Sequence, residues 1–327
     1  MPRLIVLLCV LALSSVSLSS VSLGQEADGD ADKDGSRFAA SLIEGLIANN
    51  ESLHAYSLAY TSKFESNRPG ARRVQDQKVR CYHDPDSERT IVARRTMSNQ
   101  FDSAGEMKTY DGIFLIEMVR NRQAMMTDSQ GKRRIHVPDQ KPLSMSIRLP
   151  FFHTLGFHAF PDNASSTFNR EFWKTQAVSQ EGMSSSLINN QSALVRQTFE
   201  KDGVPTVKYE WTFDLESLCP TQRKSYYFNA ELKKFVFKEL EKITWKNFNG
   251  IQLPVAIHDE NSQVAIEPGS GKRLNFTQQT ETNFLWLSVG KPMASDEPAP
   301  DQLATLDTIA RWIDSGLGEV SDGKTAR

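Results

Sequence analysis

The sequence lacks the short motifs that identify the common enzyme classes. Its 327 residues contain no Gly-x-Ser-x-Gly elbow, no phosphate-binding glycine loop, no Gly-x-Gly-x-x-Gly, no His-Glu-x-x-His and no paired Cys-x-x-Cys. Histidine is scarce as well, and His153 and His158 are too far apart for neighbouring turns of one helix and have no acid between them, which does not suit a metal site. We therefore predict a protein that is not an enzyme and that holds neither a metal nor a cofactor.

An excess of basic residues is also absent. Lys and Arg total 38 and Asp and Glu total 40, which gives a net charge of −2. The basic pairs Arg72-Arg73, Arg94-Arg95 and Arg133-Arg134 are short and separated by acids, a pattern typical of solvated strand faces. Because nucleic-acid binding requires a concentrated positive surface, we expect no nucleic-acid partner.

A long apolar run free of polar residues is missing too. The N-terminal run Leu4–Leu13 follows the positive charge of Arg3 and leads to the small residues Ser22-Leu23-Gly24, which is the order found in cleavable signal peptides. We expect residues 1–24 to be a signal peptide that is removed before Gln25. The mature protein would then be exported to the periplasm or the extracellular space and would not span the membrane.

Cysteine is nearly absent. Cys9 lies inside the expected signal peptide, so Cys81 and Cys219 are the thiols that remain in the mature chain. In an oxidising compartment two thiols can form a disulfide, but strand-like surroundings suit buried free thiols equally well. Both readings stay open at this point.

Composition divides the rest of the chain. Residues 25–35 are mostly Gly, Ala and Asp and predict a flexible leader. From Ser36, apolar residues three and four apart predict a helix that ends near Asn50. A second helix follows near the C-terminus, with Pro300 in its first turn and Gly316 just past its end. We expect one domain over 36–290, a linker with the C-terminal helix over 291–318, and a disordered tail over 319–327.

Beyond the first helix the apolar pattern has a period of two, which indicates strands with one solvated face. Asp202-Gly203 and Asn249-Gly250 predict two tight hairpin turns. A long strand is expected over 273–289. Pro254 lacks an amide donor, which predicts either that its strand lies at an edge or that this position faces out of the ladder. Long, twisted strands joined by short turns favour curvature. The predicted fold class is α+β: a strongly curved antiparallel β-sheet, or half-open barrel, with an N-terminal helix, a helical or loop lid and a C-terminal helix.

Aromatic residues are concentrated on the expected strands. Large side chains on a concave sheet can enclose an apolar cavity unless helices fill the gap, and the alternative is a packed core. The candidate cavity residues are Trp211, Phe213, Phe235, Phe237, Trp245, Phe284 and Trp286. The apolar stretch 142–160 breaks the strand alternation and predicts a lid. The lid candidates are Phe151, Phe152, Leu155 and Phe157.

One pair of acids merits a catalytic test. Glu239 and Glu241 share a strand face and could hold two carboxylates near each other, as a glycosidase requires. Lys238 and Lys242 alternate with them, which favours a solvated strand of alternating charge. A hydrolase is therefore the weakest of the functional alternatives.

Four stretches of the sequence resemble the outer-membrane lipoprotein carrier superfamily, whose members have the LolA/LolB-like fold. They are Leu53–Tyr60 after the first helix, Tyr110–Leu115 with its Asp-Gly turn, the hairpin Ile243–Pro254, and the strand Asn275–Trp286. The resemblance implies a half-open barrel around an apolar cavity lidded by helices.

The resemblance also suggests a function. It implies an exported protein that binds acyl chains, with a lipid or an acylated protein as its partner. An envelope sensor or protein-interaction module on the same fold, with an envelope protein as partner, is the alternative.

Overall fold

The computed structural model divides the chain into two units, residues 1–34 and residues 35–327, and the sheet belongs to the second unit. The structure describes residues 30–84, 86–87, 89–119, 123–127, 132–136, 178–266, 271–290 and 295–318. The lid candidates, His153, His158, the signal peptide and the C-terminal tail lie outside these residues.

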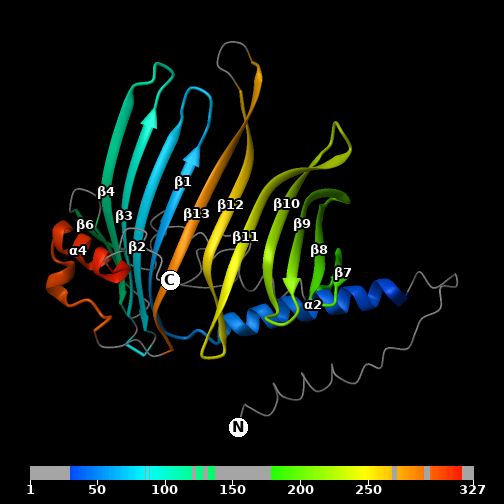
Figure 1. Cartoon of the computed structure of the whole chain (residues 1–327), viewed down its shortest axis with the longest axis horizontal. Coiled ribbons are helices and arrows are strands. Elements are labelled where there is room, and N and C mark those ends of the chain that lie inside the picture. The colour runs from blue at the N-terminus through cyan, green and yellow to red at the C-terminus, as the bar shows by residue number, and fades with distance from the viewer. Residues whose placement is uncertain are drawn as a thin grey trace, which may run out of the picture. The chain divides into compact units, whose positions relative to one another are not determined.

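The described strands form one antiparallel sheet of thirteen strands (Figure 1). Their order is β6-β5-β4-β3-β2-β1-β13-β12-β11-β10-β9-β8-β7, so the first strand pairs with the last and the described sheet is open between β6 and β7. The strands are β1 Tyr56–Ser66, β2 Arg73–Asp84, β3 Arg89–Phe101, β4 Met107–Val119, β5 Gln123–Thr127, β6 Arg133–His136, β7 Met183–Asn189, β8 Ser192–Lys201, β9 Val204–Asp214, β10 Cys219–Asn229, β11 Lys234–Phe248, β12 Ile251–Ile266 and β13 Arg273–Val289. The open antiparallel sheet confirms the predicted class, whereas its strong curvature stays a prediction.

The two hairpins expected from sequence are both present. β8 and β9 are joined by Asp202 (φ 54°) and Gly203 (φ 73°), and β11 and β12 by Asn249 (φ 55°) and Gly250 (φ 91°). Two successive residues with positive φ define the hairpin turn whose twist matches that of the flanking strands, and Asn, Asp and Gly adopt this conformation most readily. These dipeptides therefore fix where the two strand pairs begin.

Two helices pack on opposite faces of the sheet. Val92 of β3 belongs to a core that includes Leu46 of helix α2 (Asp30–Glu51), whereas Ile91 and Ala93 pack with Trp312 of helix α4 (Leu306–Leu317). Because successive residues of a strand point to opposite faces, α2 and α4 lie on different sides. We call the face of Val92 the inner face and the face of Ile91 the outer face.

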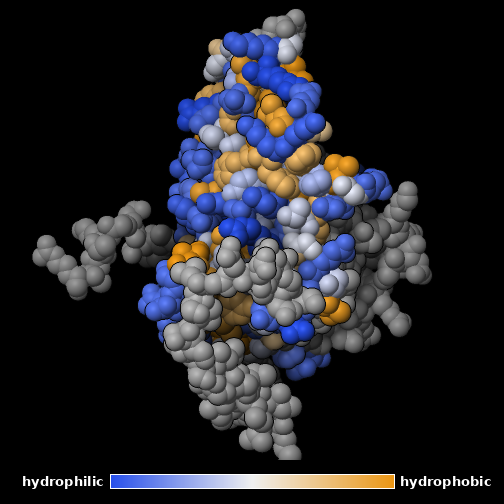
Figure 2. Space-filling view, turned by 90° about the vertical axis from the view of Figure 1, so that its right-hand side faces the viewer, coloured by the Kyte–Doolittle hydropathy of each residue, from blue (hydrophilic) through white to orange (hydrophobic). Residues whose placement is uncertain are grey.

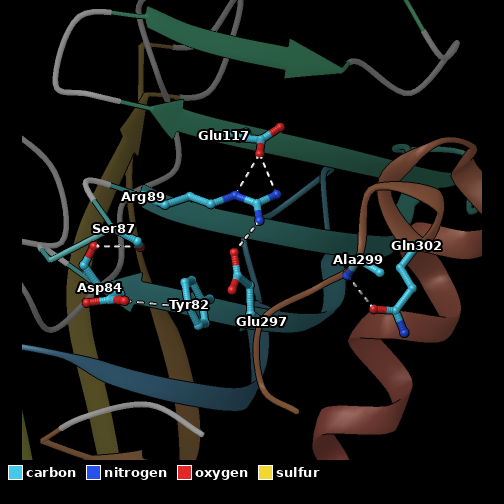
Figure 3. Close-up of polar contacts among 8 residues, drawn as sticks. All are labelled: Tyr82, Asp84, Ser87, Arg89, Glu117, Glu297, Ala299 and Gln302. Atoms are coloured by element: carbon cyan, nitrogen blue, oxygen red, sulfur yellow. Dashed lines mark hydrogen bonds and ion pairs between the residues drawn. The ribbon is translucent and has the colours of Figure 1, made fainter. Parts of the chain in front are cut away.

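Arginines anchor the C-terminal segment to the outer face. Arg80 Nη1 donates to the carbonyl of Trp312 at 2.8 Å, and the guanidinium lies over the Trp312 ring. Arg89 donates through Nε and Nη2 to Glu117 Oε1 at 2.9 and 2.7 Å and through Nη1 to Glu297 at 2.6 Å (Figure 3). Glu297 lies between β13 and α4, so this arginine ties the C-terminal segment to β3 and β4.

The helix boundaries differ from the prediction at both ends. α2 begins at Asp30, inside the stretch expected to be a flexible leader. Near the C-terminus Pro300 opens a separate short 3₁₀ helix, η1 (Pro300–Leu303), and Thr305 caps α4 by accepting from the Thr308 amide. Gly316 is inside α4 rather than past its end. A Cβ added at Gly316 would lie 2.7 Å from Arg80 Cδ.

Of the two alternatives predicted for Pro254, the edge position is wrong, because β12 lies between β11 and β13. Proline is nevertheless accommodated there. The ladder to β13 begins only at Ala256, and the register to β11 shifts between Thr244 and Trp245, which pairs with Pro254. Pro254 therefore lies beside a β-bulge and outside the ladder to β13, where the amide donor that proline lacks is not needed.

In the described residues no helix is both long enough and apolar enough to cross a bilayer.

Candidate functional site

Most of the aromatic residues expected to line a cavity lie in packed cores on the inner face. Trp211 and Phe213 pack with Ala39 and Ile43 of α2, and Phe213 has no exposed surface. Trp211 also stacks on Tyr209, with ring centroids 5.5 Å apart. Of the two arrangements that the sequence allows, a packed core and a cavity, the helix produces the core in this region.

The second aromatic group is packed in the same way. Phe284 lies 5.4 Å from the ring of Tyr60 and Trp286 lies 5.8 Å from that of Tyr56. Trp286 Nε1 donates to the Pro254 carbonyl at 2.8 Å, and Trp245, which is only partly buried, donates to the Pro220 carbonyl at 2.7 Å. Each of these indole N–H groups therefore has an acceptor. A ligand role for these residues stays a prediction.

Phe235 and Phe237 lie at the other end of β11. Their rings contact those of Phe228 and Tyr226 of β10, at centroid distances of 5.4 and 5.9 Å. Phe237 is 37% exposed, unlike the aromatic residues near α2.

β11 and β12 separate at this end of the sheet (Figure 1). Their ladder runs from Phe248↔Ile251 to Glu239↔Asn261 and stops there. Residues 234–237 still pair with β10, with Lys238 skipped at a register shift, and residues 262–266 still pair with β13. We call these two diverging segments the fork.

A hollow of about 930 Å³ lies in the fork. Apolar side chains form much of its wall, and several are well exposed: Val264 is 52% accessible to solvent. The wall residues are Asn67, Tyr227, Val236, Phe237, Lys238, Ser262, Gln263, Val264, Asn275, Phe276 and Thr277. Of the seven aromatic cavity candidates, Phe237 is the one in this wall. The sequence shows no signal for the other wall residues, because the hollow depends on where the β11–β12 ladder ends.

A second hollow, of about 420 Å³, lies near the opposite end of β11. Trp245 and Ile243 contribute to its wall, but most of the remaining wall residues are polar, among them Asp214, Glu216 and Asn247. Its composition does not suit an apolar chain.

Exposed apolar side chains occur outside the fork as well. Figure 2, which views the molecule from the side of β7, shows apolar patches among hydrophilic residues. Leu187 and Ile188 of β7 are 65% and 53% exposed, but neither contributes to the wall of the fork hollow or of the smaller one. Exposure alone therefore does not single out the fork; its hollow does.

A buried charge cluster lies on the inner face at the end of the β11–β12 ladder, next to the fork. Arg223 of β10 donates through Nε to Glu241 at 2.8 Å and through Nη2 to Glu239 at 3.3 Å. Ser225 Oγ also donates to Glu239, and Asp259 pairs across the strands with Glu241. Although burial opposes its charge, Glu241 and Glu239 hold the pKa of Arg223 above its ordinary value.

Asp259 is the strained member of this cluster. Burial, followed by the negative charges of Glu239 and Glu241, raises its pKa from 3.8 to about 7, and its Oδ1 has no hydrogen-bond partner. The expectation that Glu239 and Glu241 form a solvated strand face is therefore wrong for Glu241, whose side chain is buried. The sequence pattern did not indicate Arg223, which forms ion pairs with both of these acids.

Cys81 and Cys219 are both buried free thiols in the inner core, so the disulfide left open by the sequence is absent from the structure. Burial raises the pKa of both, that of Cys219 to about 12. Thiols held in the neutral form react slowly. Within the described residues no three His, Cys, Asp or Glu side chains form a group suited to a metal ion.

Comparisons with known proteins give a limited picture. No family model and no curated protein matches the sequence. Among solved structures, the chain is similar to a candidate outer membrane lipoprotein-sorting protein domain from Vibrio parahaemolyticus, with a TM-score of 0.34, 10% identity and coverage of 79% of this chain and 96% of that one. A DUF1329 family protein from Desulfovibrio piger also has a TM-score of 0.34 and 10% identity, with coverage of 83% and 98%. MucB, in complex with MucA(peri), has a TM-score of 0.18 and 8% identity, with coverage of 84% and 97%. Values this low assign neither a family nor a function.

Proposed function

We propose that this protein is an exported binding protein that holds an apolar chain, such as the acyl chain of a lipid or lipoprotein, in the fork hollow and catalyses no reaction. The hollow of about 930 Å³ carries the proposal, because ligand pockets in proteins typically measure about 300–1,000 Å³ and combine apolar walls with few polar groups. Export rests on the expected signal peptide at residues 1–24.

The energetic argument is the burial of exposed apolar surface. Phe237, Tyr227 and Val264 are each exposed by more than a third and border the same hollow. Each methylene that leaves water contributes about 0.8 kcal/mol, so a long alkyl chain gains more from these walls than a compact ligand does. Trp211 and Phe213, by contrast, are buried against α2.

Native mass spectrometry of the gently purified protein should show a co-purifying lipid. The direct test is titration of the delipidated protein with a fluorescent fatty-acid probe, whose emission rises when it leaves water. We expect saturable binding by the unmodified chain and a loss of at least about tenfold in affinity for Val264→Glu, because a carboxylate placed in the hollow is costly to desolvate.

The matched control is Ile188→Glu. Ile188 is exposed to nearly the same extent as Val264 but lies on β7, outside the fork. It should bind the probe as the unmodified protein does. Absence of saturable binding by the unmodified protein, or an equal loss in both variants, would remove the proposal.

A further inference from the structure

The end of the fork is basic. Lys233, Lys234 and Lys238 are exposed at the β10–β11 turn and along β11, and Arg273 stands opposite Ile266 on β13. In the part of the chain that the structure describes, none of these four cations forms an ion pair. Glu231 is the acid of the same turn, so the basic groups outnumber it.

Two acids near the fork are already engaged. Glu239 accepts from Arg223 and Ser225, and Glu210 forms ion pairs with Lys208 and Arg196. These carboxylates are therefore not available to the lysines of the fork. Glu260 of β12, beside the last pair of the β11–β12 ladder, forms no ion pair among the described residues. The four cations still outnumber Glu231 and Glu260, and Lys238 belongs to the wall of the hollow itself.

The main chain adds hydrogen-bond donors. In an antiparallel sheet alternate residues direct their N–H and C=O groups to one neighbour. Among described residues, 234–238 and 262–266 have no ladder partner on the sides that face each other, so some of their N–H groups face the fork. Amide donors beside ammonium groups favour a ligand group that accepts hydrogen bonds and bears negative charge.

We infer that the ligand of the fork hollow is an amphiphile with a negatively charged head group, a carboxylate or a phosphate. Its tail lies against Tyr227, Phe237 and Phe276, and its head lies at Lys238. This inference rests on the proposed function, because it takes tail binding as given and adds the charge of the head. It goes further in excluding neutral and cationic amphiphiles as the preferred ligands.

The test compares probes of equal chain length and different head charge. Hexadecanoic acid, hexadecyl phosphate and hexadecanol each compete with the fluorescent probe for the delipidated protein at low ionic strength. We expect the two anions to bind about two- to fivefold more tightly than the alcohol, the range of an exposed ion pair. The preference should shrink as salt is added, because salt screens exposed charges.

Variants locate the head group. Lys234→Gln together with Lys238→Gln should lower the affinity for the anions to that of hexadecanol and leave hexadecanol unchanged. Lys242→Gln is the matched control, since Lys242 is exposed on the same strand within the ladder and outside the hollow, and it should retain the preference.

Three outcomes would overturn the inference: equal affinity for the acid and the alcohol, a preference that survives the double substitution, or displacement of hexadecanoic acid by inorganic phosphate alone. The last would indicate a site for small anions. Failure of every amphiphile to bind would instead reject the proposed function, so the two failures are distinguishable.

Discussion

Phe213 and Phe237 belong to strands of one sheet and stand in similar alternating patterns, but their surroundings differ. Phe213 is fully buried beneath α2, whereas Phe237 is 37% exposed in the fork. The α2 end of the inner face has a helix, buried indoles and satisfied N–H groups. The fork end has diverging strands, a hollow and cations that form no ion pair with other described residues. The same residue type thus serves stability at one end and is available for binding at the other.

The sharpest test of this contrast is a pair of identical substitutions. Phe213→Ala should lower the free energy of unfolding by about 3–5 kcal/mol, because it leaves a cavity in a packed core. Phe237→Ala should lower it by about 1 kcal/mol or less, since its ring is already partly solvated. Urea denaturation of both variants measures the difference. Similar losses would mean that the fork is as tightly packed as the α2 end.

The charge cluster marks the boundary between the two regions. Arg223→Met should lower the free energy of unfolding by about 3 kcal/mol, because it leaves Glu241 buried without its partner. Arg95→Met is the control: Arg95 pairs with Asp111 at an exposed position, where such pairs contribute about 1 kcal/mol or less. Equal effects in the two variants would show that Glu241 is solvated after all.

The sequence predicts this contrast only in part, because local patterns do not show contacts between residues that are far apart in the chain. Local signals succeed: Asn249-Gly250 fixes a hairpin, and alternation along β13 identifies Phe284 and Trp286 as residues of one face. Whether an aromatic ring is covered depends on the path of α2, which lies far away in the chain. No local pattern indicates that Phe213 meets this helix and that Phe237 does not.

The candidate site depends even more on long-range register. Arg223 and Glu241 are on different strands, and only their pairing shows that the acid is neutralised. The hollow exists because the β11–β12 ladder ends at Glu239↔Asn261, and the chain carries no turn or proline at that point to announce it. Pro254 shows the converse, since a local rule predicted an edge and a bulge accommodated the proline inside the sheet.

A smaller loss of stability is expected where the end of α2 is hydrogen-bonded to β12. The Asn49 amide donates to the Gln252 carbonyl at 2.7 Å and accepts from the Gln252 N–H at 2.8 Å. Asn49→Ala removes both bonds and should lower the free energy of unfolding by about 1–2 kcal/mol. Ser41→Ala, which removes one exposed bond within the same helix, should change it by about 0.5 kcal/mol or less.

The last prediction concerns the pH dependence of stability. The pKa of Asp259 is about 7 in the folded state, and its ordinary value is 3.8. At a pH between these two values, Asp259 is protonated in the folded protein and ionised in the unfolded chain. Its contribution to stability therefore falls as pH rises from about 4 to 7 and is constant above that. Asp259→Asn should be more stable than the unmodified protein at pH 8 and close to it at pH 4. Urea denaturation at both values would reveal a constant difference if the carboxyl were unperturbed.

Amide hydrogen exchange of the delipidated protein, with and without hexadecanoic acid, tests the account most directly because it reports both ends of the sheet at once. We predict that the fatty acid slows exchange at 234–238 and 262–266 and leaves the strands beneath α2 unchanged. Protection that appears instead around Trp211 and Phe213, with the fork unaffected, would place the ligand among the packed aromatic rings and contradict the account.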